Sequence, residues 1–200
     1  MRSREAPRTV LHPELDVNTW QANDPDVEAA RPAACVACEG AAHRADGRLR
    51  LHGHGRRRRD WWGQAQPDGV PMLGDILVRR YRCTDCGAVM TVIPRGMVAA
   101  VRTTLATIAM ALWLWAVQEW TAVKTRQATS PLRHVGPSEP HRWRSLRRWA
   151  LDADRLFGLP VQPGTATPRE HAARIVRLLI ARGPPEGPWR DRIWRGAQAR

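Results

Sequence analysis

The chain has 200 residues, which allows one ordinary domain or a small module joined to a second compact unit, and we expect two units. Its formal net charge is +13 at pH 7, and Lys124 is the only lysine among 32 basic residues, so arginine carries almost all of the positive charge. This balance favours a polyanionic partner, nucleic acid ahead of an anionic membrane, although a high arginine content also fits a bias in genomic base composition.

The first residues exclude a secretory signal peptide of the usual form, because the arginines that follow Met1 are not succeeded by an apolar core. We therefore expect a cytoplasmic protein, in which paired cysteines bind metal or do redox chemistry more often than they form structural disulfides. Residues 1–32 show little periodicity, and we interpret them as a flexible N-terminal arm with Trp20 as its one docking point.

Residues 33–95 carry short strand patterns separated by turn residues. Candidate strands lie at residues 48–52, 57–62, 76–82 and 89–93, and a loop rich in Pro, Gly and Asp at residues 66–74 divides them into two pairs. This pattern predicts a small antiparallel β module.

Two C-x-x-C pairs, Cys35/Cys38 and Cys83/Cys86, lie at the two ends of this module. Two such pairs supply the four thiolates of a closed tetrahedral zinc site, in which the metal has a structural role. We therefore predict that Cys35, Cys38, Cys83 and Cys86 hold one Zn²⁺ in a zinc-ribbon-like module. Four merely buried thiols and a redox dithiol are the alternatives.

The spacing of the two pairs is unusual, because residues 39–82 separate them whereas about 15–20 residues are common in such patterns. A hairpin or loop must therefore be inserted. Glycines follow both pairs, and we expect Gly40 and Gly87 to supply the backbone freedom that the two turns need. With four cysteines present, His43, His52 and His54 are not needed as ligands.

Beyond residue 96 apolar residues recur at intervals of three and four, which predicts helices. The first covers about residues 97–119, and its uncharged stretch, residues 103–118, is too short to span a bilayer, so we expect a buried core helix. The second covers about residues 139–157, with Ser138 as its cap. The third begins at a capping box formed by Thr167 and Glu170 and ends at Gly183.

These patterns predict an α+β protein, a small antiparallel β zinc ribbon followed by a three-helix, helix-turn-helix-like α unit at residues 96–183. The connection at residues 121–139 has room for a helical turn or two. Residues 184–200 are rich in Pro, Gly and Arg and read as a frayed basic tail, with Trp189 and Trp194 as docking points.

Three basic segments are candidates for contact with nucleic acid. Four consecutive arginines precede two tryptophans near residue 60, a combination that can contact phosphates and stack on bases, although tryptophans packed under the ribbon are an equally good interpretation. The segment at residues 143–149 suits the second helix of a helix-turn-helix. The candidate residues are Arg56, Arg57, Arg58, Arg59, Trp61, Trp62, Arg79, Arg80, Arg144, Arg147 and Arg148.

Over residues 33–155 the chain resembles a bacterial family of zinc-ribbon proteins associated with transposases and insertion sequences. The matching pieces are the first cysteine pair, the His52-Gly-His54 turn with its arginines, the strand that enters Cys83-Thr-Asp-Cys86-Gly, the exit at Pro94 and the helical continuation. The resemblance implies double-stranded DNA as partner, next to a helix-turn-helix and usually ahead of an integrase-type catalytic core with three carboxylates. Strand signals and spaced carboxylates of such a core are missing beyond residue 103.

We therefore expect the binding portion of a transposase without its enzyme activity, with a transposase or a second copy as a further partner and no small-molecule substrate. Two other classes stay open. One is a zinc-stabilised protein-interaction or RNA-binding module, which the ten tryptophans favour. The other is an HNH-type nuclease in which His52 or His54 activates water.

Overall fold

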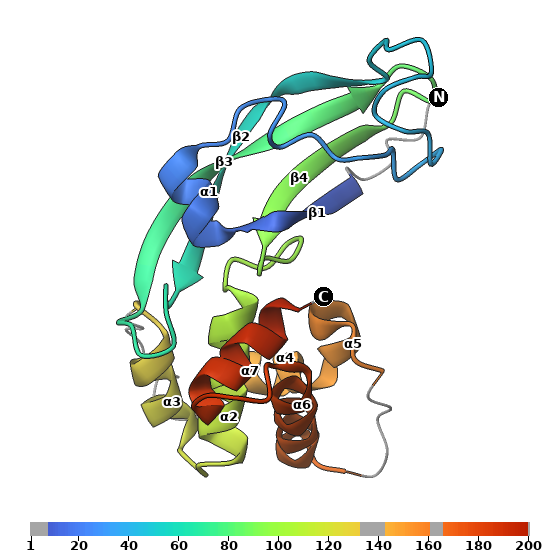
Figure 1. Cartoon of the computed structure of the whole chain (residues 1–200). Coiled ribbons are helices and arrows are strands. Elements are labelled where there is room, and N and C mark those ends of the chain that lie inside the picture. The colour runs from blue at the N-terminus through green and yellow to red at the C-terminus, as the bar shows by residue number, and fades with distance from the viewer. Residues whose placement is uncertain (1–7, 133–142, 161–165, 200) are drawn as a thin grey trace. The chain divides into compact units, whose positions relative to one another are not determined.

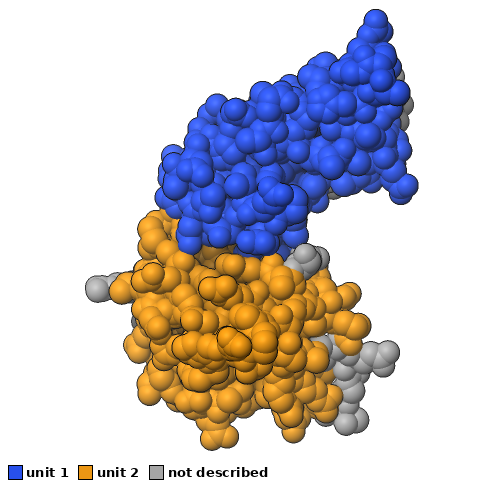
Figure 2. All heavy atoms as spheres, in the orientation of Figure 1, with its two compact units in different colours: residues 1–60, 75–99 blue, residues 61–74, 100–200 orange. Residues whose placement is uncertain are grey.

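The computed structural model describes residues 8–132, 143–160 and 166–199. These residues form four strands and seven helices, so the α+β expectation is confirmed (Figure 1). The chain divides into two compact units, which Figure 2 colours separately: unit 1 comprises residues 1–60 and 75–99, and unit 2 comprises residues 61–74 and 100–200.

Unit 1 contains a four-stranded sheet with the order β1-β4-β3-β2 (Figure 1). The strands are β1 (Arg8–Asp16), β2 (Leu51–Gly63), β3 (Met72–Cys83) and β4 (Val89–Arg95), and the last three residues of β2 belong to unit 2. β3 and β4 are antiparallel, but β1 runs parallel to β4, with Val10 opposite Val92. The expectation of a purely antiparallel module is therefore wrong, because the N-terminal segment adds a parallel strand.

The N-terminal arm that we expected to be loose is ordered over residues 8–32. After β1, Asp16 caps α1 (Val17–Asn23) by accepting a hydrogen bond from the Thr19 N–H at 2.9 Å. Trp20 is 1% exposed, and its indole N–H donates to the carbonyl of Leu77 in β3 at 3.1 Å, so the expected docking point is confirmed. The sequence did not predict this ordered structure, because the residues that contact the arm lie far along the chain.

The segment that follows α1 crosses β3 and is fixed to it by two side chains. Arg79 donates from Nε to the carbonyl of Pro25 at 2.8 Å, and the Tyr81 hydroxyl donates to the carbonyl of Val27 at 2.7 Å. Because these backbone carbonyls would otherwise be buried without partners, Arg79 and Tyr81 hold an irregular segment against the sheet.

Unit 2 is built around α2 (Leu105–Ala116), in which every residue from 105 to 114 is buried. Around it lie α3 (Ala122–Thr129), α4 (Arg144–Leu151), α6 (Pro168–Arg182) and α7 (Trp189–Gln198), while α5 (Ala153–Phe157) follows α4 (Figure 1). The expectation of a buried core helix is confirmed. In the part of the chain that the structure describes, no helix combines the length and apolarity needed to cross a membrane.

The helices of unit 2 are more numerous than the three we expected, since residues 96–183 contain α2 to α6. The first expected helix begins only at Leu105, where Thr104 caps it. The second is divided at Asp152 into α4 and α5. Its expected cap, Ser138, lies outside the described residues, as does most of the turn that a helix-turn-helix would require before α4, so that motif stays a prediction.

The third expected helix is α6, and its predicted ends are confirmed. Thr167 Oγ1 accepts from the Glu170 N–H at 3.3 Å while the Glu170 carboxylate accepts from the Thr167 N–H at 2.6 Å, which completes the capping box. Gly183 is the C-cap residue.

The tail that we expected to be frayed instead forms α7, which packs on α2 and α6. Trp189 stacks on Trp113 of α2 with ring centroids 3.6 Å apart, and Ile193 is fully buried. Gly196 permits a close helix crossing, because a Cβ there would lie 1.9 Å from the carbonyl oxygen of Leu179. The apolar residues of this short segment were too few to show a helical period before its neighbours were known.

The end of β2 is fixed to the start of α2 within unit 2. Trp62 donates its N–H to the carbonyl of Arg102 at 2.9 Å, and the Gln64 N–H donates to Thr107 Oγ1 at 2.9 Å. Between them, a Cβ on Gly63 would lie 2.4 Å from Thr107 Oγ1, so only glycine fits at this crossing.

Candidate metal centre and nucleic-acid interface

The four cysteines meet at one end of unit 1, and all four Sγ atoms lie within 4.8 Å of one another. The Sγ atoms of Cys35 and Cys86 are 3.7 Å apart, and those of Cys38 and Cys83 are 3.8 Å apart. A tetrahedral site with Zn–S bonds of about 2.3 Å places its sulfurs about 3.8 Å apart, so the donor set and its spacing fit this ion. The cluster can therefore hold a metal ion such as zinc.

The two cysteine turns have the same backbone hydrogen bonds. In the first, the Cys35 N–H donates to the Gly40 carbonyl at 2.9 Å and the Glu39 N–H donates to the Cys35 carbonyl at 2.8 Å. In the second, the Cys83 N–H donates to the Ala88 carbonyl at 2.9 Å and the Gly87 N–H donates to the Cys83 carbonyl at 3.0 Å. Each turn thus closes in the same way around its pair of thiols.

The residue that needs left-handed backbone freedom is not the same type in the two turns. Gly87 has a φ of 73°, as expected, but the equivalent residue of the first turn is Glu39, with a φ of 57°. The expectation that Gly40 supplies this backbone freedom is therefore wrong, because Glu39 is the residue with the positive φ. A Cβ on Gly40 would lie 2.7 Å from the guanidinium of Arg50, so this glycine leaves room for that side chain.

Asp85, in the middle of the second turn, joins the two turns through arginines of the first half of the module. It forms ion pairs with Arg44 and with Arg50, and the Arg50 Nε lies 2.7 Å from its carboxylate. Hydrogen bonding from Arg50 and the charges of both arginines hold the pKa of Asp85 below its usual value. Arg50 also donates to the carbonyl of Ala41 at 2.7 Å, so it spans both turns.

The thiols themselves differ in acidity. Burial raises the pKa of Cys35, but hydrogen bonds from the backbone N–H groups of Ala37 and Cys38 outweigh it and lower the pKa to about 7. For Cys86 a backbone hydrogen bond at Ala88 lowers the pKa, yet desolvation and its three thiol neighbours raise it to about 12. All four thiols can ionise together in so small a space only when a cation neutralises them, which is what a thiolate-binding metal supplies.

The predicted basic segment lies on β2, an edge strand of the sheet. Residues 52–58 are all exposed. Arg56 pairs with Asp24 at 2.9 Å and Arg58 with Asp75 at 3.3 Å, whereas Arg57 has no ion-pair partner among the described residues. Arg59 is half-buried and donates to the carbonyl of Val98, and burial lowers its pKa.

Two of the other predicted contact residues are buried, which a nucleic-acid surface does not allow. Arg79 is 8% exposed and holds Pro25, and Trp61 is fully buried, so neither side chain can reach a base or phosphate from outside. Arg80 is half-buried. Packing, the alternative interpretation of the tryptophans, accounts for Trp61.

The predicted contact residues of α4 lie on its exposed face, and its apolar residues lie on the buried face, as in an amphipathic helix. Arg144, Arg147 and Arg148 are exposed, while Leu146 and Trp149 are buried. Trp62, from the end of β2, is 9% exposed. Sequence reasoning missed Arg44, Arg50 and Asp85, whose pairing could not be read from residues so far apart.

Comparison with known proteins adds no relative. No protein-family model matches the chain, and no curated protein or solved structure matches it. What the chain does is therefore inferred from its own residues.

Proposed function

We propose that the chain is a zinc-stabilised, non-enzymatic DNA-binding protein, related to the binding portion of a transposase. The observation that supports it most directly is the exposed edge strand β2, which carries Arg56, Arg57 and Arg58 and begins next to the cysteine cluster. The protein's formal net charge of +13 gives the same preference for a polyanion.

In this proposal the metal centre has no chemical role of its own. Four cysteine ligands complete a tetrahedron and leave no position for water or substrate, which is the arrangement of structural zinc sites. The metal fixes Cys38 and Cys83, and Arg50 adds an ion pair between the two turns. The start of β2 at Leu51 is thereby held in place for contact with a partner.

The geometry of β2 suits a phosphate backbone. Successive side chains of a strand point to opposite faces, so Arg56 and Arg58 share one face and Arg57 occupies the other. The major groove of DNA admits a two-stranded β-ribbon, and β2 with its neighbour β3 forms one at the sheet edge. The ion pairs of Arg56 and Arg58 are exposed and worth about 0–1 kcal/mol, so exchanging them for phosphates costs little.

The test is a salt-titrated affinity measurement on a DNA duplex with wild type and with Arg56→Gln, Arg57→Gln and Arg58→Gln combined. Each phosphate contact contributes about −0.9 to the slope of log affinity against log salt, so the triple variant should make that slope less steep by up to about 2.7. The matched control replaces three exposed arginines of unit 2, Arg174, Arg177 and Arg195, by Gln.

Three outcomes would contradict the proposal: no binding at low salt, a flat salt response, or an equal loss in the control variant. Duplex RNA in the same titration addresses the alternative of an RNA-binding module. The A-form major groove is too narrow for side chains to read, so a strand reader should prefer DNA.

A further inference from the structure

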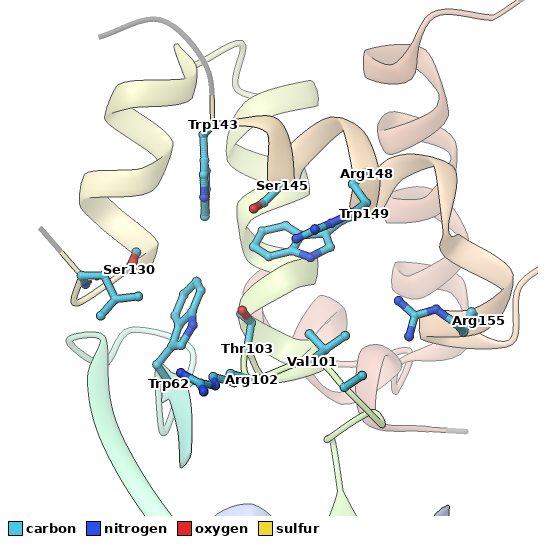
Figure 3. A pocket seen from close by; sticks show the side chains of 12 residues that line it. Trp62, Val101, Arg102, Thr103, Ser130, Trp143, Ser145, Arg148, Trp149 and Arg155 are labelled. Atoms are coloured by element: carbon cyan, nitrogen blue, oxygen red, sulfur yellow. Dashed lines mark hydrogen bonds between the residues drawn. The ribbon is translucent and has the colours of Figure 1, made fainter. Parts of the chain in front are cut away.

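Unit 2 contains a cavity of about 370 Å³ that the proposed duplex contact does not use. It lies between the end of β2, the segment before α2, the end of α3, and α4 with α5 (Figure 3). Pockets for small ligands measure about 300–1,000 Å³, so this one has the size for a single small molecule or one unit of a polymer.

Three tryptophans form its aromatic wall: Trp62, Trp143 and Trp149. Figure 3 shows their indole rings gathered around one space, with Trp62 coming from β2, Trp149 from α4 and Trp143 from the position just before α4. Trp143 meets Trp149 edge to face, with centroids 5.1 Å apart and planes at 81°, and Trp62 lies 6.4 Å from Trp149 at 47°. None of the three is stacked face to face on another, and Trp143 is only half-buried, so it is the indole that offers a surface to a flat ligand.

Arginines and hydroxyl groups complete the lining. Arg102, Arg148 and Arg155 contribute guanidinium groups, Ser130 and Ser145 contribute hydroxyls, and no acidic side chain lines the cavity among the described residues (Figure 3). Arg155 is held by Asp152, with its Nε 2.7 Å from the carboxylate. A wall of indoles beside guanidinium groups selects a ligand that is both aromatic and anionic.

The wall is held in place without any ligand. The N–H of Trp62 is bonded to the carbonyl of Arg102 and the carbonyl of Trp62 accepts from the Thr104 N–H at 3.2 Å. Trp149 is only 4% exposed and Trp62 9%, so their rings are fixed by packing. Little ordering cost then opposes binding, which favours a site over an accidental gap.

We propose that this cavity binds one unpaired nucleotide of a DNA strand, with the base on an indole face and the phosphate at Arg148 and Arg102. The inference deepens the proposed DNA-binding function and rests on it for the source of the nucleotide. A base pair within a duplex cannot enter a cavity of this size, so the nucleotide must lie in a single strand or be extruded from the helix. Stacking of a base on an aromatic side chain contributes about 1–3 kcal/mol and depends little on its identity.

The experiment measures binding of deoxyadenosine monophosphate by calorimetry to the full chain. Arg148→Ala should weaken affinity about tenfold, because it removes a charged hydrogen-bond donor from the phosphate. The control is Arg147→Ala, which removes another exposed arginine of α4 that does not line this cavity, and it should change affinity less than about twofold.

A second pair of variants tests the aromatic wall. Trp143→Leu should also weaken binding about tenfold through lost stacking, whereas Trp120→Leu, at a half-buried tryptophan outside the cavity, should have little effect. Far-ultraviolet circular dichroism establishes that each variant is folded. Short oligo(dA) should bind with the same sensitivity to Arg148→Ala, which shows that a nucleotide within a strand is accepted. The blunt duplex of that strand should not show this sensitivity, which separates an unpaired nucleotide from a paired one.

Four results would overturn the inference: no binding of deoxyadenosine monophosphate, equal losses for the Arg147 and Arg148 variants, competition by inorganic phosphate at the same concentration, or tighter binding of phosphotyrosine. The third would indicate an anion site only and the fourth a phosphopeptide. If nucleotide binding is found but salt-dependent duplex binding is not, the proposed function fails while the cavity stands. If salt-dependent duplex binding is found but nucleotide binding is not, the cavity inference fails while the proposed function stands.

Discussion

Glu39 and Gly87 occupy equivalent places in the two cysteine turns and have nearly the same backbone conformation, with φ of 57° and 73°. A left-handed conformation costs an L-residue about 1–2 kcal/mol, while glycine loses about 0.5–1 kcal/mol more backbone entropy on folding than other residues. Glu39→Gly should therefore stabilise the first turn by about 0.5–1 kcal/mol. Gly87→Ala should destabilise the second by a similar amount, and because no atom lies within 4 Å of the added Cβ, this cost is backbone strain alone.

Zinc affinity is the appropriate readout, because closing the turns and binding the metal are one equilibrium. A change of about 0.5–1 kcal/mol corresponds to about a two- to fivefold change in the dissociation constant, which competition with a chelator of known affinity resolves. Glu39→Gly should bind zinc more tightly than wild type, Gly87→Ala more weakly, and the double variant about equally. Weaker binding by Glu39→Gly, or unchanged binding by Gly87→Ala, would refute the equivalence of the two turns.

Three further predictions concern stability. Cys83→Ser should abolish zinc binding and unfold unit 1, whereas the control, Val36→Ala at an exposed residue of the first turn, should do neither. Because nine of the ten tryptophans belong to unit 2, the unfolding transition followed by tryptophan fluorescence should persist in Cys83→Ser, and its loss would show that unit 2 depends on the metal. Gly196→Ala should lower the stability of unit 2, measured by urea unfolding, by about 1–3 kcal/mol, because overpacking against Leu179 outweighs the gain in helix propensity of about 1 kcal/mol. The control, Arg195→Ala at an exposed position, should be near neutral, and a Gly196→Ala variant more stable than wild type would contradict the close helix crossing. Hydrogen bonds from Thr167 lower the pKa of Glu170 from its usual 4.5, so the stability that this carboxylate contributes is complete above that value and is lost as pH falls through the lowered pKa. Urea titrations at several pH values should therefore show a weaker loss of stability in acid for Glu170→Gln than for wild type. An unchanged loss would exclude this carboxylate as its source.

The features that sequence predicted correctly are local ones. The capping box of Thr167 and Glu170 is complete within one helical turn, so no distant partner is needed to specify it. Each C-x-x-C pair likewise determines its own turn, and the structure brings the two pairs together in a cluster that can hold a metal ion such as zinc. The burial of α2 followed from its lack of charge.

What sequence did not predict depends on partners far along the chain. β1 pairs with β4 across about eighty residues, and a parallel strand at that separation leaves no local signal. Arg79 looked like a contact for nucleic acid because nothing near it in sequence shows that Pro25 needs a donor. The same applies to the cavity, where Trp62 and Trp149 come from segments that were assigned to different units.

The chain passes between its two units after Asp60, after Gly74 and after Ala99. A single proteolytic cut, or a gene divided near residue 96, therefore cannot release two intact halves. A fragment that begins there would lack Trp61–Gly74, so Thr107 would lose the backbone N–H of Gln64 and the cavity would lose Trp62. To obtain unit 2 alone, the hairpin tip must be supplied with it, either as a separate peptide or by joining residue 74 to residue 100 through a short linker.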